Sequence, residues 1–177
     1  VGCGGSNHTK LYNIFPEGEW EETRLDIDVN VKPDIVGDIT KMTAVPDNAF
    51  DAVFSSHNLE HLYPHQVKEA LPEFYRVLKP EGIAIVRVPN ITEVAAEIAK
   101  GNLHGQLYTS PAGPICAIDI LYGFRPSIEA GNTFMAHRTA FIPSSLGMAL
   151  EQVGFTKVIV RHDGYMYSME AIGEKRK

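Results

Sequence analysis

The 177-residue chain contains little cysteine and no long apolar run. Its two cysteines, Cys3 and Cys116, are too few for a disulfide framework and lack the neighbouring ligands that a zinc site needs. No run approaches the ~18 apolar residues of a membrane span, and no charged-then-apolar leader opens the sequence. These absences predict a protein of the reducing cytoplasm that has no membrane partner.

Positive charge is also scarce, since 16 Lys and Arg residues against 22 Asp and Glu residues give a net charge of −6. The only basic cluster is the terminal segment 175–177, so a broad nucleic-acid-binding surface is not expected. Hydrophobic residues make up 44% of the chain, which is typical of a globular protein. We expect one domain over residues 1–177, and its first strand to be truncated because the chain starts at Val1. The sequence does not indicate an oligomeric state.

Strand patterns alternate with helical patterns along the chain. Apolar strand patterns occupy residues 50–56 and 82–89, with shorter ones at 21–27 and 34–38, and helical periodicity occupies 65–79, 92–101 and 143–155. This alternation predicts an α/β fold with a mostly parallel, Rossmann-like sheet flanked by helices. Pro72 is expected to kink or break its helix.

The last two strand patterns, 156–162 and 165–174, flank Asp163-Gly164 and predict a hairpin that adds an antiparallel strand. Residues 102–143 are rich in glycine and proline, with scattered aromatic residues and histidines. For this segment we predict an irregular excursion that forms a lid on the substrate side.

Glycines and polar residues follow the predicted strands. Gly2, Gly4 and Gly5 belong to the opening VGCGG, and the acids Asp26, Asp28 and Asp38 and the run Ser55-Ser56-His57 come after later strands. Ligands of an open α/β sheet bind at the carboxyl ends of its strands, so these residues predict a nucleoside pocket. An NAD site is disfavoured, because Asn7 stands where the third glycine of its fingerprint belongs.

Several of these segments together resemble the motifs of class I S-adenosylmethionine-dependent methyltransferases. They are VGCGG, LDID, PDNAFDAVFSSHNLEHL and EFYRVLKPEGIAIVRVP, which cover about residues 1–90, and the VGF-then-hairpin ending. The run IDILYGFRPSIEAGNTFMAHRTAF is similar to small bacterial methyltransferases (type 11-like) whose substrates are unassigned. The resemblance implies a seven-stranded sheet of order 3-2-1-4-5-7-6, with strand 7 antiparallel. It also implies S-adenosyl-L-methionine as cofactor and S-adenosyl-L-homocysteine as product.

The resemblance further implies a role for each part of the pocket. Gly2 and Gly4 would approach the methionyl part of the cofactor. Asp26 would bind the ribose hydroxyls, with Asp28 as the second choice. Asp38 and Ile39 would hold the adenine, while Ser56 and His57 would close over the methionine. The complete set of expected cofactor-binding residues is Gly2, Cys3, Gly4, Asp26, Ile27, Asp38, Ile39, Ser56 and His57.

The expected reaction is in-line methyl transfer to an unidentified small-molecule acceptor, in which alignment supplies most of the acceleration. No catalytic residue is assigned, although His57 and His137 are candidates for a general base. The expected acceptor-binding residues are Tyr122, Arg125, Asn132, His137 and Arg138, with Met135 beside them. His137 taken alone also fits a structural histidine, and either arginine also fits a tie that holds the lid.

His57, Glu60 and His61 form an HxxEH pattern that on a helix places three metal-ligand side chains on one face. No further protein ligand is evident elsewhere, so pocket lining is favoured and no metal is predicted. A metal-assisted methyltransferase that uses these three residues is the alternative. A further alternative is a non-catalytic module that binds a nucleoside or S-adenosylhomocysteine.

Overall fold

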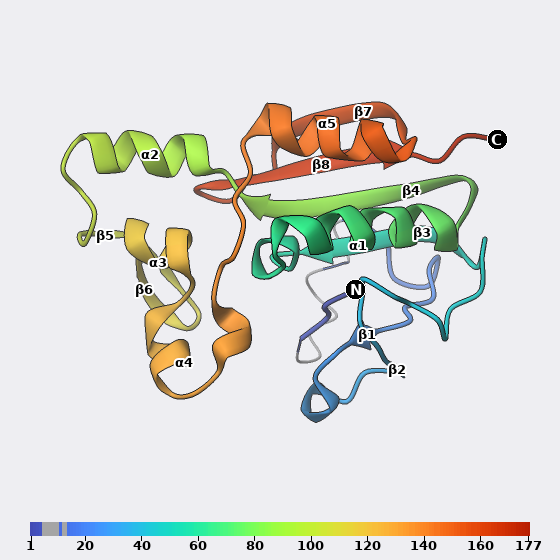
Figure 1. The fold of residues 1–177 in the computed structure, drawn as a ribbon, viewed down its shortest axis with the longest axis horizontal. Helices are drawn as coiled ribbons and strands as arrows, with labels where there is room; N and C mark the ends of the chain where they lie inside the picture. Colours follow the sequence, from blue (N-terminus) through green and yellow to red (C-terminus); the bar gives the residue numbers. More distant parts are fainter. Residues whose placement is uncertain (5–10, 12–13) are drawn as a thin grey trace.

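The computed structural model describes residues 1–4, 11 and 14–177. Its centre is a four-stranded sheet in the order β3-β4-β8-β7 (Figure 1). Strands β3 and β4 are parallel, and β8 is antiparallel to both of its neighbours, which confirms the antiparallel strand of the predicted hairpin. The bounds are β3 Phe50–Ser56, β4 Leu78–Pro89, β7 Thr156–His162 and β8 Ser168–Glu174.

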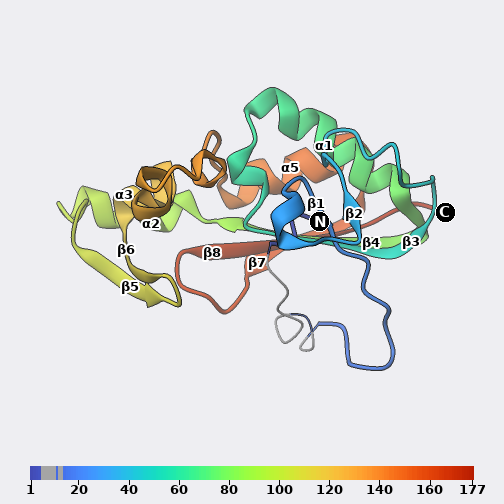
Figure 2. The same cartoon turned by 90° about the horizontal axis from the view of Figure 1, so that it is seen from below.

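Helices α1 (Pro64–Val77) and α5 (Pro143–Val153) cover one face of this sheet (Figure 2). Helix α1 buries Val67, Leu71 and Phe74 at helical spacing, which is the apolar stripe that the sequence predicts. Pro72 lies inside α1 on its exposed side and does not end the helix. The expected break is therefore wrong.

The N-terminal part of the fold has a separate, two-stranded parallel sheet. It consists of β1 (Leu25–Asp26) and β2 (Ile35–Val36), joined through the short helix η2 (Val29–Val31). Residues 1–3 lie between this sheet and β3, because the Val1 nitrogen donates to the Phe54 carbonyl oxygen (2.7 Å) and the Cys3 amide to that of Leu25 (3.3 Å). These bonds do not make a ladder, so the described residues form sheets of four, two and two strands instead of one seven-stranded sheet.

Residues 102–143 are not the irregular excursion that we predicted. With α2 (Ile91–Ala99) they form a satellite region beyond one end of the central sheet (Figures 1 and 2). A small core of Val94, Ile115, Ala117 and Ile120 holds it together. The prediction failed because these apolar residues pack on α2, a contact that local periodicity does not reveal. The elements are β5 Gln106–Ser110, β6 Gly113–Cys116, α3 Ala117–Tyr122, α4 Arg125–Glu129 and η4 Thr133–Met135.

The C-terminal elements match the sequence prediction closely. Helix α5 is followed by Gly154 in the left-handed conformation (φ 115°), which is a common way for a helix to end. Ser145, the third residue of α5, accepts a hydrogen bond from the Ile142 amide through its hydroxyl and so supports the start of the helix. The β7–β8 connection spans residues 163–167 and is longer than the predicted two-residue turn. Within the described part of the chain, no helix has the length and apolar character required to cross a bilayer.

Candidate functional site

A cavity of about 740 Å³ lies between the β1–β2 sheet and β3. Its volume is within the range of small-molecule sites, and we call it the main cavity. Four of the expected cofactor-binding residues line it: Gly2, Cys3, Ser56 and His57. The carboxyl end of β3 and the opening glycine turn therefore meet at one cavity, as the strand-end argument predicts.

The glycine turn needs glycine at both Gly2 and Gly4, since each has φ +58°. A Cβ on Gly2 would overlap the side chain of Asn58, whereas a Cβ on Gly4 would face open space. The Arg24 guanidinium donates to the Gly4 carbonyl oxygen at 2.7 Å and fixes the turn from the strand side. Sequence reasoning missed Arg24, because an arginine before a strand carries no recognisable signal.

Asp26 lies directly behind this turn and is only 8% exposed. One carboxylate oxygen accepts from the Gly4 amide (2.8 Å) and the other from the Asp28 amide (2.9 Å). A carboxylate has about four acceptor positions, so two remain for hydroxyl donors such as those of a ribose. Asp26 is thus adjacent to the main cavity without being part of its lining.

The other expected cofactor residues lie away from the cavity wall. The Ile27 side chain is exposed, and Ile39 is buried in the main hydrophobic core. One Asp38 oxygen accepts from both the amide and the hydroxyl of Thr40 (2.8 Å each). Gly5 and Asn7, which the sequence argument also used, lie outside the described residues.

Aromatic side chains form part of the cavity wall. Phe15 packs edge-on against Trp20, with ring centroids 4.8 Å apart, and against Phe54 at 6.3 Å. Cys3 also lines the cavity, and burial raises the pKa of its thiol, an effect that the Arg24 charge only partly opposes. Cys3 is therefore a wall residue and not an activated nucleophile.

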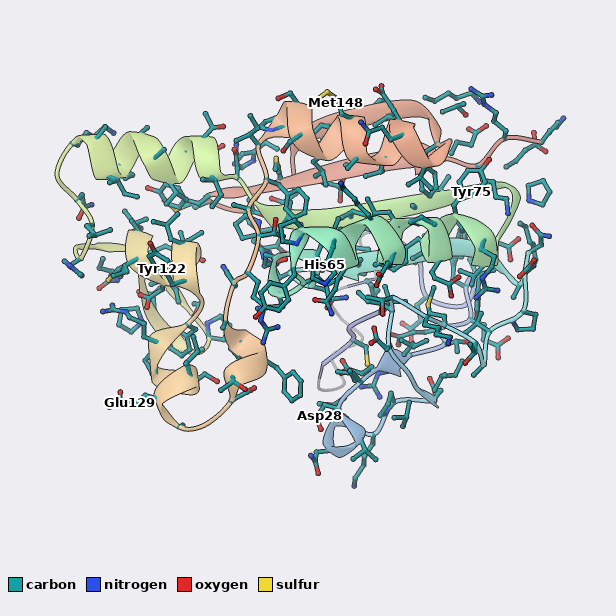
Figure 3. All side chains as sticks on the ribbon, in the orientation of Figure 1. Asp28, His65, Tyr75, Tyr122, Glu129 and Met148 are labelled. Carbon is teal, nitrogen blue, oxygen red and sulfur yellow. The ribbon has the colours of Figure 1, made fainter. Side chains whose placement is uncertain are left out.

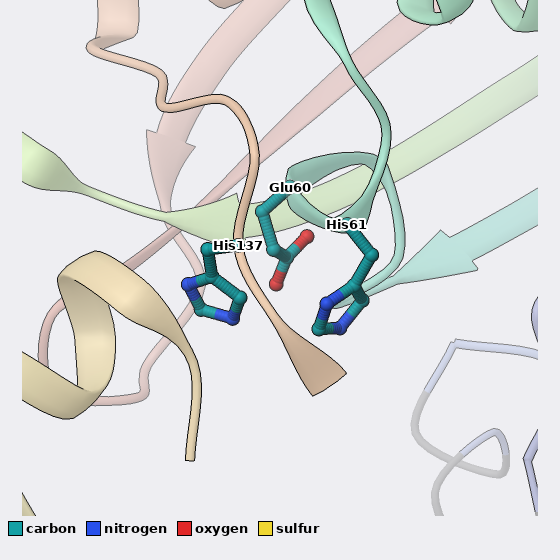
Figure 4. Close-up of side chains that lie close together, drawn as sticks. All are labelled: Glu60, His61 and His137. Atoms are coloured by element: carbon teal, nitrogen blue, oxygen red, sulfur yellow. The ribbon is translucent and has the colours of Figure 1, made fainter. Parts of the chain in front are cut away.

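A second group of side chains, which we call the histidine cluster, consists of Glu60, His61 and His137 (Figure 4). Glu60 and His61 belong to η3 (Leu59–His61), and His137 follows η4. One ligand atom from each side chain lies within 4.8 Å of the others. The HxxEH pattern identified two of these residues, but the third comes from a distant segment, which local spacing does not predict.

Glu60 connects the histidine cluster to the main cavity. Its Oε1 lies 3.2 Å from Nδ1 of His57, which lines the cavity. Burial by itself raises the pKa of Glu60, but the hydrogen bond from His57 and the charges of the surrounding histidines lower it below the ordinary value. Burial lowers the pKa of His137, although Glu60 and the Ile120 carbonyl oxygen favour its charged form.

The expected acceptor-binding residues divide into two groups. Tyr122, Arg125 and Asn132 lie in the satellite region, where Tyr122 is exposed on α3 (Figure 3). Arg125 is engaged by Asp119, with Nε 2.7 Å from a carboxylate oxygen. His137 and Arg138 instead lie against η3, and Met135 is the last residue of η4. None of these residues is among those that line the main cavity.

Comparison with known proteins finds methyltransferases among the proteins similar to this chain. Residues 1–86 match the family described as "Methyltransferase domain". The chain is 46% identical over 52 residues to the probable methyltransferase ltbC of Aspergillus luteorubrus, a match that covers 29% of this chain and 18% of that protein. The matched segment thus spans less than a fifth of that relative's length.

Two solved structures share the fold. A S-adenosylmethionine-dependent methyltransferase from Archaeoglobus fulgidus superposes with a TM-score of 0.65 at 19% identity, covering 98% of this chain and 83% of that one. Phosphoethanolamine N-methyltransferase 2 of Haemonchus contortus, in complex with S-adenosyl-L-methionine, gives 0.60 at 12% identity, covering 99% of this chain and 47% of that one.

The family match thus covers slightly less than half of the chain, and the superpositions show that the whole chain shares the α/β fold of these methyltransferases.

Proposed function

We propose that the chain transfers the methyl group of S-adenosylmethionine to a small-molecule acceptor at the end of the main cavity bounded by Gly2, Ser56 and His57. The observation that carries this proposal is the meeting of the positive-φ glycine turn and the end of β3 at one cavity of about 740 Å³. When bound, the cofactor supplies a methyl group on a positively charged sulfur, already activated for displacement. The protein's task is alignment of the acceptor, which reduces the entropic part of the barrier.

The chain's own residues fit the cofactor in this proposal. Asp26 binds the ribose hydroxyls through its two remaining acceptor positions, while the Gly4 and Asp28 amides hold its carboxylate in place. Gly2 and Gly4 leave room for the methionyl part, because neither carries a side chain. We assign the adenine to the neighbourhood of Asp38 through backbone groups, since the Ile39 side chain is buried in the core.

His57 is the better candidate for a general base if the acceptor is a hydroxyl. Its side chain is half exposed and belongs to the cavity wall, whereas His137 does not reach this wall. Glu60 accepts from Nδ1 of His57, which favours the tautomer whose Nε2 can take up a proton. His137 donates through Nδ1 to the Ile120 carbonyl oxygen, and it belongs with Glu60 to the histidine cluster.

The acceptor in this proposal approaches over η3, where Arg138 and His137 are fixed. Arg138 donates to the His61 carbonyl oxygen at 2.7 Å and lies over the Tyr63 ring, with its guanidinium carbon 5.1 Å from the ring centroid. The residues of the satellite region, Tyr122, Arg125 and Asn132, would meet only a large acceptor. A cytoplasmic setting is also part of the proposal, because both cysteines are free.

We also propose that the two N-terminal strands and the central sheet form one continuous sheet of order 3-2-1-4-5-7-6. In this arrangement β2 and β1 are strands 3 and 2, and residues 1–3 take the place of strand 1. The hydrogen bonds from Val1 to β3 and from Cys3 to β1 support it.

An activity assay tests the proposed function. The protein is incubated with S-adenosylmethionine and a panel of small phenols, amines, thiols and carboxylic acids, and S-adenosylhomocysteine release is measured by mass spectrometry. We expect release with at least one class. For a hydroxyl acceptor, His57→Ala should lower kcat by roughly 100-fold, and its effect on S-adenosylhomocysteine affinity should be much smaller than that on kcat. Absence of release from every class, together with absence of S-adenosylhomocysteine binding, would overturn the proposal.

A further inference from the structure

The histidine cluster has the composition of a metal centre. Two imidazoles and one carboxylate converge, with one ligand atom of each within 4.8 Å of the others, and their side chains point toward one another (Figure 4). The His61 and His137 rings meet edge to face, with centroids 4.9 Å apart and an interplanar angle of 64°. A cation placed among three such atoms would be within bonding reach after small side-chain adjustments.

Glu60 gives the strongest indication of a missing partner. Its side chain is 2% exposed, and its Oε2 has no hydrogen-bond partner among the described residues. A buried carboxylate oxygen without a partner is costly, and such atoms are rare in folded proteins. Oε1 is already engaged by His57, so Oε2 is the atom that a cation in the cluster would satisfy.

The two histidines are oriented as metal ligands usually are. Nδ1 of His137 donates to the Ile120 carbonyl oxygen at 2.7 Å, which leaves its Nε2 with a lone pair. Nδ1 of His61 contacts the Ala136 carbonyl oxygen at 3.3 Å. Metal-bound histidines characteristically donate their other ring nitrogen to a carbonyl or carboxylate, which fixes the ring and its tautomer.

Backbone contacts hold the two halves of the cluster together. The Arg138 and Thr139 amides both donate to the Glu60 carbonyl oxygen, at 2.8 and 3.2 Å, and the Arg138 guanidinium donates to that of His61. These bonds attach the segment that carries His137 directly to η3. The ligand set is therefore preorganised by groups that are not themselves ligands.

We propose that Glu60, His61 and His137 bind a divalent transition-metal cation of the zinc class. Two nitrogen ligands favour such an ion over Mg²⁺ or Ca²⁺, which prefer oxygen. Three protein ligands leave at least one coordination position for water or an acceptor group. His57 lies outside this set and is linked to it through Glu60, which differs from the HxxEH set that the sequence suggests. The inference does not depend on the proposed methyl transfer, because metal binding is measured directly.

The test uses the full 177-residue chain after treatment with a chelator. Calorimetric titration with Zn²⁺ and the visible absorption of added Co²⁺ report binding and coordination. We expect one ion per chain. His137→Ala and His61→Ala should each weaken binding beyond the roughly 10–100-fold that loss of an outer partner costs. His104→Ala, a surface histidine in the satellite region, is the matched control and should bind as the wild type does.

Glu60→Gln separates a metal site from a merely polar cluster. It keeps the shape and one acceptor oxygen but removes the charge, so metal affinity should fall while circular dichroism and S-adenosylhomocysteine binding remain. Absence of Zn²⁺ binding to the wild type, or equal binding by wild type, His137→Ala and Glu60→Gln, would overturn the proposal. S-adenosylhomocysteine binding, measured in the same preparations, shows separately whether the cofactor assignment holds.

Discussion

Asp26, the last residue of β1, and Glu60, in η3 after β3, are both buried carboxylates, yet their surroundings differ. Asp26 is 8% exposed, and backbone amides occupy one position on each of its oxygens. Glu60 is surrounded by histidines, and its Oε2 has no partner among the described residues. Backbone amides of the chain bind the Asp26 carboxylate, whereas in our proposal a bound metal cation supplies the partner of Glu60 Oε2. This difference separates a carboxylate that can accept hydrogen bonds from ligand hydroxyls from a carboxylate whose surroundings fit a metal cation.

Asp26→Ala should have the largest effect, because it removes the group that organises the glycine turn and the ribose contact. The Gly4 and Asp28 amides would lose their acceptor, which costs about 2 kcal/mol of unfolding free energy, and S-adenosylhomocysteine binding should be lost. Urea unfolding and calorimetry measure the two effects. Asp28→Ala, which removes only the side-chain bonds to Asn30, should cost about 1 kcal/mol, and equal losses in both variants would contradict the comparison.

Gly2→Ala and Gly4→Ala form a matched pair at the turn. Both substitutions place alanine at φ +58°, which costs roughly 1 kcal/mol, but only the first also overlaps Asn58. Gly2→Ala should therefore destabilise the protein more, as measured by its midpoint of thermal unfolding. If Gly4→Ala were the more damaging for stability, this description of the turn would be wrong.

The histidine cluster should make stability depend on pH in the metal-free protein. The folded-state pKa of His137 is lowered, chiefly by burial, so its contribution is fully present above its ordinary pKa of about 6.5. That contribution is lost as the pH falls through the folded-state pKa. The groups that act on His137 are Glu60, His61 and His57, so urea unfolding should be compared between wild type and His137→Gln from about pH 7.5 to about pH 5.5. The variant should lose less stability over this range, and identical curves would argue against the burial of a neutral His137.

Arg125→Ala should have the smallest effect, because Arg125 lies in the satellite region, away from both Asp26 and Glu60. Arg125 is half exposed in its ion pair with Asp119, so its removal should change the unfolding free energy very little. Affinity for S-adenosylhomocysteine and for Zn²⁺ should not change. A large drop in either affinity would show that the satellite region is coupled to the sites.

The sequence predicted the elements whose signals are local. Residues 50–56 form β3 with the expected bounds, and Gly154 ends α5 as a left-handed C-terminal residue. The strands β1 and β2 are only two residues long each, because pairing with neighbours, and not composition, decides strand length. The order of seven strands stays a prediction.

The parts that escaped prediction depend on contacts between distant segments. The β5–β6 hairpin is stabilised by packing on α2, and His137 meets Glu60 and His61 only after the chain folds. Arg24, which immediately precedes β1, donates to the Gly4 carbonyl oxygen across 20 residues of sequence. A pattern of neighbouring residues contains no information on such long-range contacts. The order of the motifs along the chain was nevertheless sufficient to indicate the methyltransferase class.

Calorimetric titration of the metal-free chain with S-adenosylmethionine and S-adenosylhomocysteine, with NAD as control, tests the central claim most directly. The account predicts that both sulfur nucleosides bind in the micromolar range, that NAD does not, and that Asp26→Asn weakens binding whereas Asp28→Asn does not. Equal affinity for NAD, or nucleoside binding that survives unchanged in Asp26→Asn, would contradict it.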